Sequence, residues 1–259
     1  MNVFKHELKS NLKSFLVWSL GLFFLVFFGL IEFSGFENDS AAVGSIFSNF
    51  PRMFLALMGI NDLDPTTTSG YYGILFNYIL IITSLFSINL GSNAAAAELN
   101  GKTSEFLFSK PLSRLGILSQ KTLSGLLFIF VLCILNYIFS ISSFAAAGII
   151  NDIAYLLFLF CAALFFVSIF FFAFGFFCSS LNVKKGSLIA NLLFLCFYFL
   201  GFLYDMFEKN AVLRMLSPLK FFEVASDRKI EMLFVLYSIA LAFVLLILSF
   251  WILGKKDMA

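Results

Sequence analysis

Charged residues are scarce in this chain, as are proline, cysteine and histidine. Its 259 residues include four Pro, four Cys and one His, and only 12% of its side chains are charged. An ordinary soluble domain carries about 25% charged residues, so the composition excludes that class. The net charge of +2 is too small to favour a nucleic-acid partner, and we expect none.

The few cysteine and histidine residues do not form a reactive or metal-binding pattern. The sequence has no CxxC motif and no Cys/His spacing typical of zinc sites, and its only histidine is His6. No span carries a His/Cys/Asp set or a Gly-x-Ser-x-Gly turn. We therefore expect buried free thiols, no metal site and no intramembrane enzyme. The thiols are Cys133, Cys161, Cys178 and Cys196.

Apolar residues dominate instead. The chain is 61% hydrophobic, contains 39 Phe and has a mean hydropathy of +0.99. A helix needs about 20 apolar residues to cross a bilayer, and six segments qualify. The sequence thus predicts an all-α membrane protein with six transmembrane helices in a single domain over residues 1–259. The expected spans are residues 15–33, 72–96, 123–147, 153–181, 187–204 and 230–253.

The distribution of Lys and Arg predicts that both termini are cytoplasmic. Lysine and arginine are enriched on the cytoplasmic side of membrane proteins, and the pair Lys184-Lys185 in a short loop indicates the side most clearly. With this orientation, acidic residues concentrate in the outer loops. We expect a multi-pass protein of the plasma membrane, the cytoplasmic membrane of a bacterium.

Little of the chain lies outside the expected spans. Residues 1–14 have lysines at i, i+4 spacing opposite apolar residues, which predicts an amphipathic helix in the cytoplasmic interface. The outer loops contain two further apolar stretches, Ala42 to Ile60 and Ala211 to Leu216. We expect short interfacial or re-entrant helices there. No segment is long enough for a soluble catalytic domain.

The polar stretch ELNGKTSEFLFSKPLSR, from Glu98 to Arg114, interrupts the apolar sequence. Its Gly-Lys-Thr matches the end of a P-loop, but Ala96 occupies the place of the required upstream glycine. We therefore expect this chain to bind no ATP and no other cofactor directly. The stretch predicts a cytoplasmic elbow instead: Gly101 ends one helix, Thr103 or Ser104 caps a short helix over 104–109, and Pro111 stops it.

The same stretch resembles the signature of ABC-2 type transporter permeases. The matching positions are Glu98, Gly101, Lys102-Thr103, Glu105-Phe106-Leu107, Ser109, Pro111, Ser113-Arg114, Ile117 and Lys121. Lys102 between glycine and threonine departs from the family pattern. The turn Ser217 to Phe222, with its Pro218, resembles a second family feature, and the six-span layout matches over essentially the whole chain.

The resemblance implies that this chain is the membrane subunit of an ABC exporter. ATP and Mg would bind a separate Walker-motif subunit, and a second permease, identical or related, would complete the path. The helix over 104–109 would be the coupling helix. The implied coupling residues are Glu98, Gly101, Thr103, Glu105, Phe106, Leu107, Pro111 and Arg114. For Lys110 and Lys121, anchoring at the lipid headgroups is an equal alternative.

No expected span has a charge at its centre, which argues against a proton- or sodium-coupled carrier. Asn77, Ser84 and Asn136 are candidates to line a path, although such groups more often bond between helices. The Phe-rich spans suit a hydrophobic or amphipathic passenger, such as a drug, an antimicrobial peptide or a lipid-like molecule. The alternatives are an ATP-independent secondary transporter or channel, or a membrane-embedded sensor that transports nothing.

Overall fold

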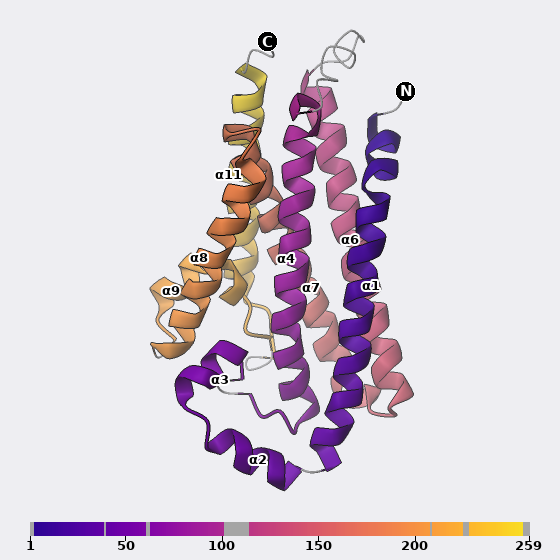
Figure 1. The fold of residues 1–259 in the computed structure, drawn as a ribbon, viewed down its shortest axis with the longest axis vertical. Coiled ribbons are helices and arrows are strands. Elements are labelled where there is room, and N and C mark those ends of the chain that lie inside the picture. The colour runs from indigo at the N-terminus through magenta and orange to yellow at the C-terminus, as the bar shows by residue number, and fades with distance from the viewer. Residues whose placement is uncertain are drawn as a thin grey trace.

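Among the residues that it describes, a computed structural model of the protein consists mostly of six long helices (Figure 1). The structure describes residues 3–38, 40–60, 63–100, 114–207, 209–224 and 228–255. All six helices are long and apolar enough to cross a membrane. The predicted fold class, an all-α membrane protein with six spans, is confirmed. The long helices are α1 Val3–Asn38, α4 Thr68–Asn100, α6 Arg114–Ala146, α7 Ile150–Leu181, α8 Gly186–Met206 and α11 Met232–Lys255.

The short helices gather at one end of the molecule. Figure 1 shows them opposite the end where α1 begins and α11 finishes. They are α2 Ser40–Ser48, α3 Arg52–Met58, α9 Ala211–Leu216 and the 3-10 helix η1 Pro218–Lys220. Pro51 separates α2 from α3, because proline cannot continue a helix from the preceding turn. Short helices thus form where the sequence predicted them, and their depth relative to a membrane stays a prediction.

The first helix is longer than expected. α1 runs without a break for 36 residues, or about 54 Å at 1.5 Å per residue, well beyond a hydrocarbon core of about 30 Å. Within residues 3–38 the predicted separate helix over 1–14 is therefore not seen, and residues 3–14 are the first turns of α1. Neither proline nor glycine occurs before Gly21 to interrupt them. Whether these turns lie in the interface stays a prediction.

The centre of the bundle is the contact between α4 and α7. A Cβ atom on Gly91 would collide with the carbonyl oxygen of Phe172, and one on Gly175 would collide with that of Ile88. Ser92 Oγ donates a hydrogen bond to the Gly175 carbonyl at 3.2 Å. Small residues at membrane-helix contacts let the backbones approach closely, so glycine is required at both positions.

Large aromatic side chains fill the space around this contact. Phe171, Phe172 and Phe176 of α7 are fully buried. Phe171 meets the ring of Phe194 from α8, and Phe176 meets Phe250 from α11. These three phenylalanines of α7 therefore belong to the core between spans, whereas Phe24 and Phe28 of α1 are exposed.

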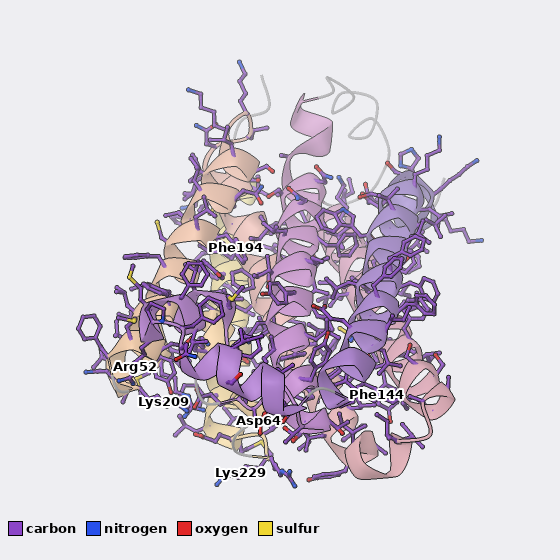
Figure 2. The ribbon with its side chains drawn as sticks, turned by 60° about the horizontal axis from the view of Figure 1, so that its bottom comes forward. Arg52, Asp64, Phe144, Phe194, Lys209 and Lys229 are labelled. Atoms are coloured by element: carbon purple, nitrogen blue, oxygen red, sulfur yellow. The ribbon has the colours of Figure 1, made fainter. Side chains whose placement is uncertain are left out.

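Charged side chains mark both ends of the bundle. Figure 2 shows Arg52, Asp64, Lys209 and Lys229 at the end that carries the short helices. Asp64 accepts hydrogen bonds from the backbone nitrogen of Thr66 at 2.9 Å and from its hydroxyl at 2.7 Å. These bonds lower the pKa of the Asp64 carboxyl. The turn they stabilise leads into α4, where the Thr67 hydroxyl caps the helix by accepting from Gly70 N.

Candidate functional site

The predicted coupling segment lies between α4, which is described as far as Asn100, and α6, which is described from Arg114. Glu98 lies in the last turn of α4 and Arg114 opens α6. The other coupling residues, Gly101, Thr103, Glu105, Phe106, Leu107 and Pro111, fall outside the described residues, as does the expected helix over 104–109. Their coupling roles stay a prediction.

An ion pair ties this end of α6 to the start of α1. Lys121 Nζ lies 3.3 Å from Glu7 Oε1, and the lysine side chain is 2% exposed. Next to it, Phe4 N donates to Gln120 Oε1 at 3.3 Å, and Asn11 Nδ2 donates to Glu7 Oε2 at 3.3 Å. Lys121 is therefore inside the protein and not at the headgroups. The only feature of the sequence that could have indicated this pair is that Glu7 is a single carboxylate among three lysines, Lys5, Lys9 and Lys13.

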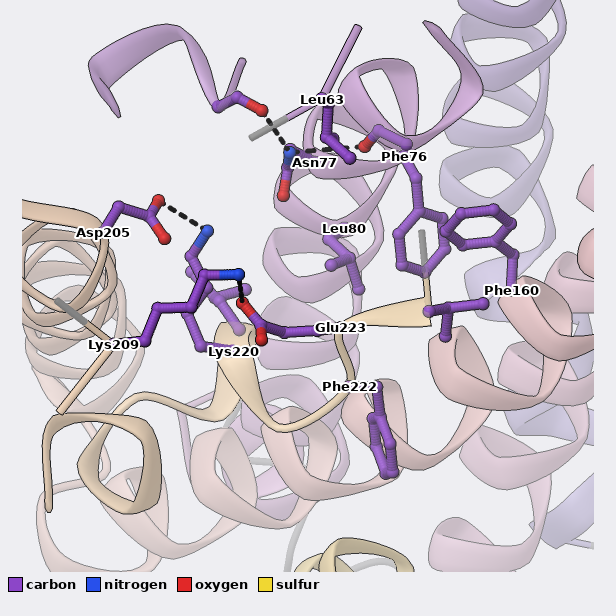
Figure 3. A pocket seen from close by; sticks show the side chains of 14 residues that line it. Leu63, Phe76, Asn77, Leu80, Phe160, Asp205, Lys209, Lys220, Phe222 and Glu223 are labelled. Carbon is purple, nitrogen blue, oxygen red and sulfur yellow. Dashed lines mark hydrogen bonds and ion pairs between the residues drawn. The ribbon is translucent and has the colours of Figure 1, made fainter. Parts of the chain in front are cut away.

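At the opposite end, a cavity of about 70 Å³ lies between α4, α8 and the segment after α9 (Figure 3). Two ion pairs form part of its wall. Lys220 Nζ lies 2.7 Å from Asp205 Oδ2, and Lys209 Nζ lies 3.6 Å from Glu223 Oε1. Phe76, Leu80, Phe160 and Phe222 supply the apolar part of the wall. The cavity thus combines paired charges with aromatic surface.

Asn77, one of the three candidate path residues, lines this cavity. Its Nδ2 donates to the carbonyl oxygens of Gly59 and Gly73, each at 3.3 Å. Tyr198 donates to the Leu57 carbonyl at 3.1 Å and Tyr78 donates to that of Met58 at 3.4 Å. The last carbonyls of a helix lack partners within the helix. Side chains of α4 and α8 therefore satisfy the end of α3 and hold it over the cavity.

The other two candidates lie elsewhere. Ser84 is fully buried, and its Oγ has no hydrogen-bond partner among the described residues. Asn136 is also buried, and its backbone carbonyl accepts from Ser140 Oγ, whose hydroxyl is 2.7 Å from Tyr72 Oη. The structure therefore does not bring Asn77, Ser84 and Asn136 to one site. A path role for any of them stays a prediction.

Arg214 organises the buried segment beside the cavity. It lies 2.9 Å from Glu231 Oε1 and donates to the carbonyls of Lys220 and Phe221 at 3.3 and 3.2 Å. Its guanidinium also sits 4.3 Å from the ring centre of Phe234. The turn resembling the family's proline motif is thus held inside the protein. Sequence reasoning gave Arg214 only a place in an outer loop.

A second polar group lies at the other end of the α4–α8 face. Asn191 Nδ2 and Ser187 Oγ of α8 both donate to Asn89 Oδ1 of α4, at 3.1 and 3.2 Å. All three residues are partly exposed. Polar groups in spans face protein or water, so this face is unsuited to lipid. Asn89 and Asn191 were not among the candidate path residues chosen from the sequence, although both interrupt apolar runs.

Comparison with known proteins supports the family resemblance that the stretch from Glu98 to Arg114 indicated. A family model described as ABC-2 family transporter protein matches residues 1–258. A comparison with curated proteins gives no match. The family match covers nearly the whole chain and agrees with its six membrane-length helices. The chain therefore belongs to the ABC-2 transporter family and is a multi-pass membrane protein.

Proposed function

We propose that this chain is the membrane permease subunit of an ATP-driven exporter in the plasma membrane. A separate Walker-motif subunit hydrolyses ATP with Mg and docks on the segment between α4 and α6. Family membership supports this role, because ABC-2 permeases typically work with such a subunit. The Glu7–Lys121 pair also supports it, because it links the helix that leaves the docking segment to α1.

The observation that carries the proposal is the polar α4–α8 face. The amides of Asn89 and Asn191 are partly exposed at one end, and the charged cavity lies at the other. An isolated chain in lipid would leave these amides against acyl chains, which is unfavourable. A second permease, identical or related, facing this surface would enclose a path between the two copies.

The passenger is a hydrophobic or amphipathic molecule, such as a drug, an antimicrobial peptide or a lipid-like compound. Between its polar ends the face is apolar: Ile81 and Ile82 of α4 are partly exposed, and Leu192 and Leu195 of α8 are exposed. A molecule with apolar bulk and one polar group matches such a surface better than an inorganic ion. Asn77 and the Asp205–Lys220 pair would meet it near the exit.

Transport in proteoliposomes tests the function. The chain would be reconstituted with the ATP-binding subunit that co-purifies with it, using the hydrophobic dye Hoechst 33342 as the probe. We expect ATP-dependent dye movement that needs both subunits. Dye movement driven by a proton gradient without that subunit would support a secondary transporter instead.

Replacing Asn191 by leucine tests the location of the path. We expect Asn191→Leu to slow ATP-dependent dye movement at least severalfold, because it removes the donor to Asn89 and the polar surface. Leu193→Ala is the matched control, because Leu193 is 41% exposed and lies two residues after Asn191, on the opposite side of α8. Equal transport by Asn191→Leu and the native chain would place the path elsewhere.

A further inference from the structure

A groove of about 430 Å³ runs between the outer-end halves of α1 and α4. Phe47 of α2 and Met58 and Ile60 at the end of α3 cover one end of it. Its volume is within the range of about 300–1,000 Å³ that small-molecule sites occupy. The groove is distinct from the α4–α8 cavity, since the Tyr78 hydroxyl donates to the Met58 carbonyl at 3.4 Å between them.

The walls of the groove are two helical stripes. Phe24, Phe28 and Glu32 recur every four residues on α1, a spacing that places side chains on one face of a helix. Gly29 lets Leu75 of α4 pack closely at the floor, because a Cβ there would lie 2.9 Å from Leu75 Cδ1. Phe24 is 44% and Phe28 59% exposed. The described residues therefore leave this side of the groove open to the surroundings.

The groove is polar at its outer end and apolar below it. Glu32 is the penultimate residue of the membrane-length segment Val3–Phe33, and Tyr71 is near the start of Thr68–Ala96. The Tyr71 hydroxyl donates to Glu32 Oε2 at 3.3 Å. In a membrane this carboxylate would lie at the level of the headgroups. Phe24 and Phe28 would lie two and one turns deeper, at the level of the acyl chains.

The segment that connects α1 to α4 is acidic in sequence. Residues 32–64 contain Glu32, Glu37, Asp39, Asp62 and Asp64, and their only cation is Arg52. The Glu32 carboxylate in the groove wall, within a segment of this composition, disfavours an anionic headgroup and favours one with a positive charge. A primary ammonium carries N–H groups that donate hydrogen bonds to a carboxylate, whereas a quaternary ammonium has none.

We propose that this groove binds one phospholipid of the outer leaflet with a primary-ammonium headgroup. The ammonium pairs with Glu32, which Tyr71 holds in place, and an acyl chain lies against Phe24, Phe28 and Leu75. This site does not depend on the transport role, because it needs neither ATP nor a partner subunit.

Native mass spectrometry of the purified full-length chain tests the headgroup preference. The probes are dioleoyl-phosphatidylethanolamine and dioleoyl-phosphatidylcholine in equal amounts, which differ only in the ammonium. We expect about tenfold preferential retention of the ethanolamine lipid, the size of one hydrogen bond to a charged group. Glu32→Gln should remove the preference while total lipid retention persists, and Tyr71→Phe should reduce it.

The control is Glu231→Gln, which removes a carboxylate beyond the groove that pairs with Arg214 and should leave the preference intact. Equal retention of both lipids by the native chain would overturn the proposal. An unchanged preference in Glu32→Gln would overturn it as well, since the carboxylate would then not be the binding group.

Photo-crosslinking identifies the occupant directly. Phe28→p-benzoylphenylalanine, irradiated in native membranes, should gain the mass of one phospholipid. An adduct with twice the protein mass would show that a second copy covers the groove and would overturn the lipid assignment. An adduct with an added Hoechst 33342 probe in place of lipid would assign the groove to the passenger and overturn it too.

Discussion

At the residue scale, the cations at the short-helix end are notable for their partners. Lysine and arginine are normally less frequent in the outer loops of a membrane protein than in its cytoplasmic loops. At the short-helix end, Lys209, Arg214 and Lys220 each pair with a carboxylate. Each pair neutralises a cation at the short-helix end. These residues therefore do not contradict a cytoplasmic location of the termini, which stays a prediction.

The Glu7–Lys121 pair gives the first prediction at this scale. Lys121→Met should lower the free energy of unfolding by about 3 kcal/mol, because removing one partner leaves the other charge buried. The double variant Glu7→Gln, Lys121→Met should recover more than half of that loss. Thermal unfolding in detergent measures both. A single variant as stable as the native chain would mean that the pair contributes nothing.

The turn at Asp64 gives a prediction on pH. Because its hydrogen bonds to Thr66 lower the folded-state pKa, the stabilisation is fully present above the unfolded value of about 3.9. It is lost as the pH falls through the lower folded value. The difference in unfolding midpoint between the native chain and Asp64→Ala should therefore be largest at pH 6 and shrink below about pH 4. A difference independent of pH would contradict this account.

At the element scale, the spans could be predicted and their pairing could not. Runs of about 20 apolar residues define membrane helices by length alone, and all six expected segments lie largely within observed helices. Asn89 and Asn191 are 102 positions apart in the sequence, and no local pattern connects them. The same holds for Glu7 and Lys121. Local periodicity also could not show that residues 3–14 belong to the same helix as the first span. An amphipathic helix and a spanning helix have the same backbone conformation, so the side-chain pattern does not show whether the chain breaks between them.

The close contact of α4 and α7 gives a prediction for these elements. Gly175→Ala should destabilise the protein by about 1–3 kcal/mol, the usual cost of overpacking, because its Cβ would meet the Ile88 carbonyl. Gly21→Ala is the matched control, since nothing lies within 4 Å of a Cβ there. We expect the control to be neutral or slightly stabilising in thermal unfolding. Equal effects of the two substitutions would rule out backbone contact as the reason for Gly175.

At the scale of the whole molecule, the two ends have different tasks in the proposed transporter. One end carries the helix ends that flank the predicted coupling segment, braced by Glu7 and Lys121. The other carries the short helices and the charged cavity (Figures 1 and 3). The closely packed α4–α7 contact lies between them. In the proposed transporter, movement at the coupling end would reach the charged cavity through α4, which contributes to both ends.

The sequence predicted less of the site than of the fold. The motif from Glu98 to Lys121 indicated the family correctly, because it is a contiguous stretch that can be recognised without the fold. Asn77 alone among the candidate path residues reaches the cavity, because Ser84 and Asn136 turn into the bundle. From the sequence alone, a serine or asparagine in an apolar run could face either the cavity or the interior of the bundle. Only the packing of the helices shows which of the two it faces.

The most direct test of the central claim is a mild-detergent purification from native membranes, followed by mass spectrometry of the proteins that remain bound. The account predicts a Walker-motif ATPase in roughly equal amount, together with a second permease that is either identical or related. Recovery of the chain without any ATPase, together with no ATP hydrolysis when candidate ATPases are added in lipid, would contradict the ATP-driven exporter.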